Sequence, residues 1–369
     1  MTAELLLPLV STNLNFNSST QFVPGWYWAI PSRSLPVGKV KAVTLMGRDL
    51  AIYRGANGQT VAMDAYCPHM GAHLAEGRVD GDDLRCFFHN WKYDAQGICL
   101  DVPALEKPLP VCVKIWRTAE IYGLVWVWVG EATPRALPYA PELEGIDLDS
   151  VLGSRFVKNC HPNVLLINAI DAHHFNTVHN LPLEIVFDKS ILHENAIAFN
   201  NITQGGNESW LIRLIRPLYR NAVTYSMCYW YGSTGTVTLG PDFLHFYIMF
   251  ALRPIAGNKT EGQTILMTPK RAGCLGWALN RILLWLTQQV GNYFAKGDTQ
   301  VFQTIQFDLK TPTFADRSIL QFMQHVNQQK AIAWATWEPV PQDESGDIPP
   351  LPSHNAISAI LALEDREVP

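Results

Sequence analysis

The sequence predicts an α+β protein, in which an all-β N-terminal unit precedes an α+β unit built on an antiparallel sheet flanked by helices. Short alternating apolar runs separated by turn signals fill residues 22–132, which is typical of a small β domain. Longer strand patterns and one long helical pattern follow in residues 142–338. The Pro-rich residues 133–141 between the units indicate a linker.

The N-terminal unit contains several short strand patterns. Asn57-Gly58, Asp80-Gly81 and Gln96-Gly97 are turn signals between them. The last pattern contains Trp126-Val-Trp-Val129, which indicates a buried closing strand. The strands that we expect are residues 40–45, 50–54, 60–64, 111–116 and 124–129.

In the C-terminal unit we expect strands over residues 209–215, 223–231 and 244–252, and helix from 274 to 309. Residues 190–270 are expected to line a substrate pocket. Residues 1–21 form an N-terminal extension, and the Pro-rich, acidic residues 339–369 form a C-terminal tail.

Composition and charge limit the functional classes. Of 369 residues, 48% are hydrophobic and 17% are charged, which is typical of a folded globular protein. The net charge of −5 and the lack of a long basic run argue against nucleic acid as a partner. The N-terminus lacks the basic region of a secretory signal, so we expect a cytoplasmic protein.

The apolar segment 274–290 is interrupted by Asn280 and Arg281, so we do not expect it to span a membrane. One interpretation is a helix of the core or of a subunit interface. The other is a peripheral contact with the membrane surface, which would admit an apolar substrate.

Two loops carry a metal-ligand pattern. Of the seven cysteines, only Cys67 and Cys86 have a histidine two or three residues downstream, and these are His69 and His89. Two thiolates and two imidazoles can bind Zn²⁺ or a Rieske-type [2Fe–2S] cluster. In a Rieske cluster one iron takes both cysteines and the other takes both histidines, so each loop must supply one of each. Each loop does so, and we therefore predict the cluster; zinc and unrelated core cysteines are the alternatives.

Residues 22–130 resemble the Rieske domain of aromatic-ring and sterol oxygenases. The Cys67-Pro-His-Met-Gly71 segment is similar to the ketosteroid hydroxylase and pheophorbide a oxygenase side of the Rieske non-haem iron oxygenases. Respiratory-chain Rieske proteins carry an additional cysteine in each loop, whereas this chain has Ala72 and Phe88 or their neighbours there. Asn90 stands where the family usually has glycine, which predicts a different loop shape after His89.

The resemblance extends to a second metal motif, Asp-x-x-His-x-x-x-x-His. His174 and His179 match the family's two iron-binding histidines, Asp171 its bridging catalytic carboxylate, and Asn168 an amide that lies behind the iron ligands. A straight helix would separate the two histidines by about 140°. A bend or helix end is therefore expected near Asn176-Thr177.

The family's third iron ligand is a carboxylate far downstream, and we assign it to Asp298. Asp308 and Asp316 are the competing choices. His173 is a rival histidine on another helix face, where we expect it to support the iron ligands or to have a structural role. The alternative for the whole motif is a partly buried polar helix with satisfied histidines.

The resemblance implies the oxygenase (α) component of a system that uses O₂ and Fe(II). It would hydroxylate, demethylate or desaturate a small organic, apolar cyclic substrate. Because no dinucleotide or flavin signature is visible, electrons from NAD(P)H would arrive through a separate ferredoxin or reductase. The family's homotrimer places His89 of one subunit against Asp171 of the next. A Rieske electron carrier and a structural zinc protein are the competing functions.

Overall fold

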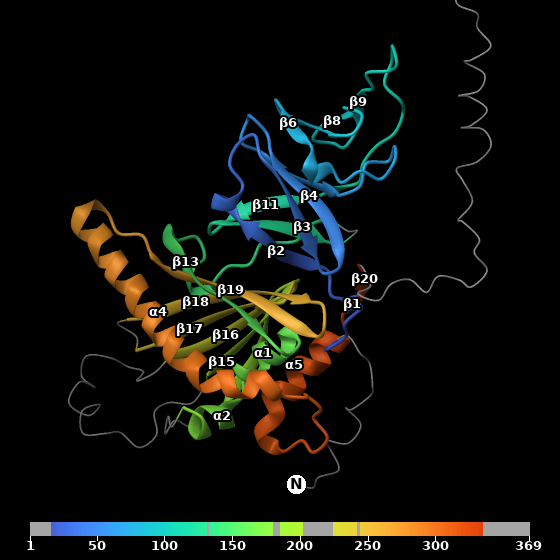
Figure 1. Cartoon of the computed structure of the whole chain (residues 1–369). Helices are drawn as coiled ribbons and strands as arrows, with labels where there is room; N and C mark the ends of the chain where they lie inside the picture. Colours follow the sequence, from blue (N-terminus) through green and yellow to red (C-terminus); the bar gives the residue numbers. More distant parts are fainter. Residues whose placement is uncertain (1–15, 131–132, 180–184, 202–223, 242–243, 335–369) are drawn as a thin grey trace, which may run out of the picture.

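The computed structural model describes residues 16–130, 133–179, 185–201, 224–241 and 244–334. Figure 1 shows the N-terminal unit stacked on one side of a large C-terminal sheet, with the helices on its other side. Both units have the predicted class, β-rich first and then an antiparallel sheet with helices.

The N-terminal unit contains three small antiparallel sheets. Their strand orders are β10-β5-β4-β3, β11-β12-β2 and β6-β7-β8-β9. The first sheet comprises β3 (Val40–Leu45), β4 (Arg48–Arg54), β5 (Thr60–Asp64) and β10 (Ile115–Trp116). The second comprises β2 (Gly25–Pro31), β11 (Thr118–Ile121) and β12 (Leu124–Val129). The third comprises β6 (Arg78–Asp80), β7 (Asp83–Arg85), β8 (Lys92–Tyr93) and β9 (Cys99–Asp101).

The predicted turns of this unit are confirmed, since Gly58, Gly81 and Gly97 all have left-handed backbone with φ of 83°, 68° and 82°. The predicted strand 111–116 is wrong in length, because only its last two residues form β10. The N–H of Val113 donates to Gly97 O, so this part of the chain pairs with the preceding loop instead.

The C-terminal unit is built on a seven-stranded antiparallel sheet of order β13-β19-β18-β17-β16-β15-β14. Its strands are β13 (Leu148–Lys158), β14 (Phe187–His193), β15 (Ala196–Asn201), β16 (Thr224–Trp230), β17 (Thr234–Gly240), β18 (Phe246–Ile255) and β19 (Lys259–Pro269). β16 and β18 correspond to two predicted strands. The third, 209–215, lies outside the described residues, as do residue 223, most of the N-terminal extension and the whole C-terminal tail.

Four helices cover one face of this sheet: α1 (Pro162–Asn168), α2 (Ala172–Thr177), α4 (Gly273–Thr304) and α5 (Arg317–Asn327). The predicted helix 274–309 is therefore confirmed as α4, although it ends five residues early. A short pair of strands, β1 (Gln21–Phe22) and β20 (Ile332–Ala333), joins the two ends of the described chain.

The central strands of the large sheet are buried on both faces. Side chains alternate along β18, as they do in any strand. Tyr247, Met249 and Ala251 pack against tryptophans of the N-terminal unit. Ile248 and Leu252 lie on the face that the helices cover, in hydrophobic clusters whose side chains line a cavity described below. The N-terminal unit thus covers one face, and the site forms on the other.

The same alternation lets β12 belong to two cores, and all six of its residues are buried as predicted. Val125 and Val127 face the core of the N-terminal unit, while Trp126 and Trp128 pack against the large sheet. The abundance of tryptophan therefore serves the contact between the units.

A buried arginine also connects the units. Arg253, only 7% exposed, donates Nη1 hydrogen bonds to Ala29 O at 2.7 Å and Trp28 O at 3.3 Å. Its Nη2 pairs with the Glu261 carboxylate at 2.7 Å. Arg155 also donates to the Glu261 carboxylate, so Glu261 would keep one cationic partner if Arg253 were lost.

Candidate metal centres

The two Cys/His loops lie side by side at the outer end of the N-terminal unit. The first follows β5, and the second connects β7 to β8. Cys67 and Cys86 are buried, whereas His69 and His89 are exposed with ring centroids 4.6 Å apart. The fold therefore groups thiol with thiol and imidazole with imidazole, as a Rieske cluster requires.

Hydrogen-bond donors surround the two sulfurs. The Tyr93 hydroxyl lies 3.1 Å from Cys67 Sγ, and the backbone N–H groups of Phe88 and His89 reach the Cys86 sulfur. Burial raises the pKa of Cys86, and the nearby Cys67 raises it further. Metal binding requires thiolates, so a bound iron would supply the positive charge that this buried pair lacks. The donor set and its surroundings fit a [2Fe–2S] cluster.

Asn90 has a backbone φ of 59°, in the left-handed region that glycine adopts most readily and asparagine tolerates. Its Oδ1 accepts a hydrogen bond from Arg78, and its carbonyl accepts one from Arg85, both at 2.9 Å. A glycine could adopt the same conformation, so the substitution does not require the different loop shape that the sequence suggested.

The second centre brings together two histidines and an aspartate from segments more than one hundred residues apart. The Nε2 atoms of His174 and His179 lie 2.9 and 3.0 Å from Asp298 Oδ1. The ligand atoms of all three residues lie within 4.8 Å of one another. Burial lowers the pKa of His179, which favours the neutral imidazole that binds metal.

The geometry of these three residues fits a mononuclear metal ion. Ligands about 2.1 Å from a metal and about 90° apart would be separated by about 3 Å, which matches the His–Asp distances. Nε2 of His179 is buried and has no hydrogen-bond partner among the described residues, although Asp298 lies close. Its lone pair is therefore available to a metal, and two histidines with one carboxylate are typical of non-haem Fe(II).

The break predicted between the two histidines is confirmed. Helix α2 ends at Thr177, so His179 lies beyond it and turns back toward His174. Asn168, the last residue of α1, places Nδ2 3.3 Å from His174 Nε2. Its amide is thus beside the centre, where the sequence comparison expected it.

Asp171 has a local role that the sequence reasoning missed. It is the N-cap of α2, and its Oδ1 accepts hydrogen bonds from the backbone N–H groups of His173 and His174, both at 3.1 Å. Within the described chain, this carboxylate makes no hydrogen bond to the ring of His174, as a carboxylate bridging to that ligand would. Nδ1 of His174 is buried without a hydrogen-bond partner in the described chain.

The rival residues lie away from the centre. The side chain of His173 is exposed. Asp308 is 62% exposed and pairs with Lys310, while Asp316 caps a short helical turn through Thr313. Only Asp298 among the three candidate carboxylates approaches the histidines.

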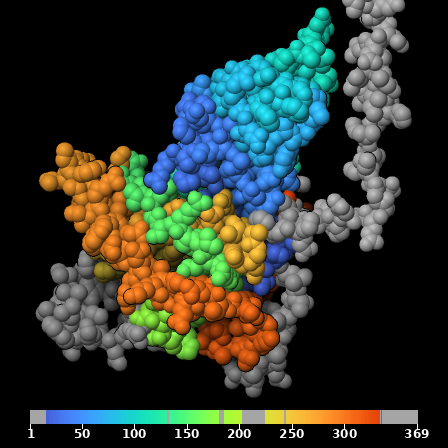
Figure 2. All heavy atoms as spheres, in the orientation of Figure 1, coloured from blue at the N-terminus to red at the C-terminus, as the bar shows by residue number. Residues whose placement is uncertain are grey.

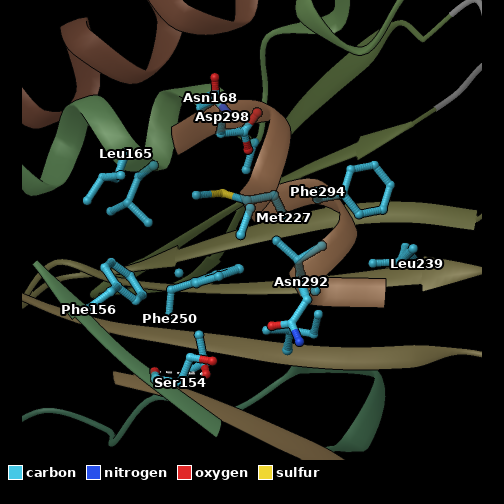
Figure 3. A pocket seen from close by; sticks show the side chains of 18 of the residues that line it. Ser154, Phe156, Leu165, Asn168, Met227, Leu239, Phe250, Asn292, Phe294 and Asp298 are labelled. Carbon is cyan, nitrogen blue, oxygen red and sulfur yellow. Dashed lines mark hydrogen bonds between the residues drawn. The ribbon is translucent and has the colours of Figure 1, made fainter. Parts of the chain in front are cut away.

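A cavity of about 230 Å³ opens beside the triad, between the large sheet and α4 (Figure 3). Its middle is apolar, and it is lined there by Phe156, Leu165, Met227, Phe250 and Phe294. An apolar cavity that contains a few polar groups is typical of a small-molecule site. The predicted lining segment 190–270 supplies part of the wall, from β16, β17, β18 and β19, and β13 and α4 supply much of the rest.

Four polar residues of this cavity were not foreseen: Ser154, Lys158, Gln288 and Asn292. Lys158 Nζ donates to Thr299 Oγ1 at 2.8 Å, next to the triad. The only sequence signal was the alternation of Ser154, Phe156 and Lys158 along β13, which places all three on one face.

Comparison with known proteins agrees with this geometry. Residues 25–118 match the family model of the Rieske [2Fe-2S] domain. The aminopyrrolnitrin oxygenase PrnD of Pseudomonas fluorescens is 36% identical over 180 residues, which are 46% of this chain and 49% of that protein. The oxygenase component of 3-ketosteroid-9-alpha-monooxygenase from Rhodococcus rhodochrous is 31% identical over 168 residues, or 43% of each chain. The matched part is thus about half of each relative's length or less.

The terminal oxygenase of carbazole 1,9a-dioxygenase from Novosphingobium sp. KA1 superimposes with a TM-score of 0.64 at 16% identity. The match covers 85% of this chain and 94% of that one, which shows that both units share its fold.

Proposed function

We propose that this chain, which belongs to the Rieske non-haem iron oxygenases, is the oxygenase component of a multicomponent monooxygenase. Residues 22–132 would hold the cluster through Cys67, His69, Cys86 and His89, and residues 142–338 would hold Fe(II). The observation that carries the proposal is the convergence of His174, His179 and Asp298 beside an apolar cavity.

When bound, the cluster would supply single electrons and the mononuclear Fe(II) would supply activation of O₂. The residues of the chain position the reaction. Asn168 and the two histidines fix one side of the iron site, and Asp298 the other. Phe156, Phe250 and Phe294 keep the cavity apolar, so the substrate displaces water as it enters. Hydroxylation, demethylation and desaturation are all compatible with such a site.

Electron supply distinguishes this function from that of a Rieske electron carrier. We propose that electrons from NAD(P)H arrive through a separate ferredoxin or reductase; the name of the Rhodococcus relative, an oxygenase component, agrees with this. With a surrogate reductase, O₂ uptake should depend on substrate and should be abolished in His179→Ala while the cluster still reduces. A carrier would give equal, substrate-independent O₂ uptake in both proteins, and that result would reject the oxygenase.

We further propose a head-to-tail homotrimer. The cluster loops and the triad lie at opposite ends of the molecule, at the top and bottom of Figure 1. This separation is long for electron transfer within one subunit. Around His69 and His89, the apolar side chains of Met70, Phe87 and Phe88 are exposed. Such an apolar tip is suited to docking, and we place the neighbouring subunit's Asp171 region on it.

Subunit complementation tests this arrangement. Cys86→Ser removes the cluster and His179→Ala removes the iron, so each homotrimer alone should be inactive. In mixed trimers from equal co-expression, one interface in four would join an intact cluster to an intact iron site, so roughly one quarter of wild-type turnover should return. No recovery in mixtures confirmed by mass spectrometry would contradict transfer between subunits.

The amino-terminal half of α4 supports peripheral membrane contact. It projects from the body at the left of Figure 2, with Leu275 89% exposed and Trp277 59% exposed. The core interpretation is therefore wrong for these side chains. Lys270 and Arg271 are exposed just before the helix, and Arg281 lies over the Trp277 ring. Tryptophan and basic residues together favour an anionic lipid surface. None of the helices described could cross a bilayer.

Liposome flotation tests the membrane contact. Anionic vesicles should carry the protein upward, neutral vesicles should carry less, and Trp277→Ser with Trp285→Ser should abolish flotation. Two results together would assign this surface to a subunit interface instead. The unaltered protein would stay wholly in the soluble fraction, and the double Trp→Ser variant would have the mass of a monomer.

A further inference from the structure

The cavity is polar at both ends and apolar in the middle, and its two polar ends differ. At one end are the triad and Lys158. At the other, four side chains form a neutral polar group that we call the polar mouth: Ser154, Thr264, Gln288 and Asn292. Figure 3 shows Ser154 and Asn292 on the opposite side of the cavity from Asn168 and Asp298.

The lengths of one strand segment and one helix segment give two independent values for the distance between the two polar ends of the cavity. Strand β13 and helix α4 run side by side, because Ser154 contacts Gln288 and Lys158 contacts Thr299. Four residues of strand, from Ser154 to Lys158, span roughly 13 Å. Ten residues of helix, from Gln288 to Asp298, span roughly 15 Å. A substrate that touches both ends must therefore be elongated.

The side chains of the polar mouth are organised. Gln288 Nε2 donates to Asn292 Oδ1 at 2.8 Å, one helical turn along, and to Ser154 Oγ at 3.4 Å. Thr264 Oγ1 donates to Ser154 O at 3.1 Å. A methyl group on Gly153 would lie 2.5 Å from Thr264 Oγ1 and 2.6 Å from Gln288 Oε1, so the glycine lets both side chains close over the strand.

The mouth offers both kinds of hydrogen bond. Once Gln288 Nε2 has donated within the group, Gln288 Oε1 remains as an acceptor and Asn292 Nδ2 as a donor; exchanging O and N in both amides still leaves one of each. A hydroxyl group donates and accepts, so it matches this pair. None of the described side chains that line this end is charged, so the mouth offers a carboxylate no counter-charge. Ser154 and Asn292 are exposed, so a hydroxyl bound there also stays in contact with water.

Lys158 does not change this choice. Its ammonium donates to Thr299, and the Asp298 carboxylate attracts its charge, although burial still lowers the pKa of Lys158 overall. Lys158 therefore lies at the metal end, roughly 13 Å from the polar mouth, and takes no part in it.

We infer that the substrate is an elongated amphiphile with an apolar body and one neutral hydroxyl at its far end, which Gln288 and Asn292 bind at the polar mouth. Oxidation then takes place about 13 Å from that hydroxyl, at the end nearest Asp298. The inference rests on the proposed function only for the site of oxidation, since recognition of the hydroxyl needs neither iron nor turnover.

Equilibrium dialysis of the holoenzyme against three probes tests the inference: decan-1-ol, 1-methoxydecane and decanoate. The ether is more apolar than the alcohol but lacks the donor, so a preference for decan-1-ol reports hydrogen bonding. We expect up to about tenfold tighter binding of the alcohol than of the ether, as the one hydrogen bond that only the alcohol can donate would give. Gln288→Leu with Asn292→Leu should reduce this ratio to about one. Gln289→Leu, an exposed glutamine on the same helix, is the matched control and should preserve it.

Three results would overturn the inference. The first is an unchanged ratio of alcohol to ether affinity in the double variant, with circular dichroism showing that this variant is folded. If the double variant is unstable, Gln288→Leu alone is tested in its place. The second is tightest binding of decanoate, lost in Lys158→Met, which would place an anion at the metal end. The third is no binding of decan-1-ol up to its solubility limit. Loss of O₂ uptake with intact alcohol preference would instead reject the proposed function alone.

Discussion

Asp171→Asn separates two roles of one side chain. In the structure Asp171 Oδ1 accepts two backbone N–H bonds at 3.1 Å and caps the helix that carries His174. Asparagine is as good an N-cap as aspartate, so the free energy of unfolding should change by only a few tenths of a kcal/mol. Asp171→Ala loses the cap and should cost about 1 kcal/mol.

The charge of Asp171 matters for the proposed electron path. In the proposed trimer, the Asp171 carboxylate lies beside His174 and can accept a hydrogen bond from a ring N–H of the neighbouring subunit's His89. An asparagine at this position can place its N–H₂ donor where that acceptor is needed. Loss of such a partner at a metal ligand typically costs 10–100-fold in activity. We therefore expect Asp171→Asn to keep its fold and both metals but to lose about 100-fold in turnover.

Three measurements check this prediction together: iron content, reduction of the cluster monitored by visible absorption, and single-turnover product yield. Asp171→Ala is the control for the cap, since its loss of activity would be accompanied by a lower stability. Near-normal product yield in Asp171→Asn, with both metals present and the cluster reduced, would refute the bridge and leave only the capping role.

Three further changes have defined outcomes. Arg253→Met should lower the free energy of unfolding by about 1–3 kcal/mol in denaturant titration, because the carbonyls of Trp28 and Ala29 lose their donor while Arg155 still pairs with Glu261; an unchanged midpoint would contradict this. Tyr93→Phe removes the hydroxyl beside Cys67 and should lower the cluster's midpoint potential by about 60 mV. This value follows if the hydrogen bond stabilises the reduced cluster by about 1.4 kcal/mol more than the oxidised cluster. A higher potential in the variant would contradict this role of the hydroxyl. Burial lowers the pKa of His161 to about 4, below its value in the unfolded chain, so the unfolded state binds the proton first and stability should fall by up to about 3 kcal/mol as pH drops from 6.5 to 4. His161→Asn should flatten that part of the pH profile, and an unaltered profile would show that another group is responsible.

The sequence was sufficient where ligands are local or the chemistry is specific. The spacing from Cys67 to His89 predicted the cluster loops, and the five-residue separation of His174 and His179 predicted the end of α2 between them. Asp298 needed the family resemblance, since spacing alone cannot select among distant carboxylates. The N-cap role of Asp171 was accessible, because an aspartate directly before a helical pattern is a standard start signal.

Other features depend on tertiary packing and could not be predicted. Lys158 and Gln288 reach one cavity only because β13 and α4 pack together, more than one hundred residues apart in sequence. Strand β14 escaped notice because it is an edge strand with mostly exposed side chains, so it lacks apolar alternation. The double burial of β18 follows from the N-terminal unit covering its second face.

The central claim is that one chain holds a Rieske cluster and a separate mononuclear iron. Iron and sulfide analysis combined with EPR of the dithionite-reduced protein tests it most directly. Anaerobically purified protein should contain about three irons and two inorganic sulfides per chain and give a Rieske-type signal. His179→Ala should contain about two irons with the same signal and the same sulfide. A zinc-containing colourless protein, or a variant that loses the cluster signal together with the third iron, would contradict the account.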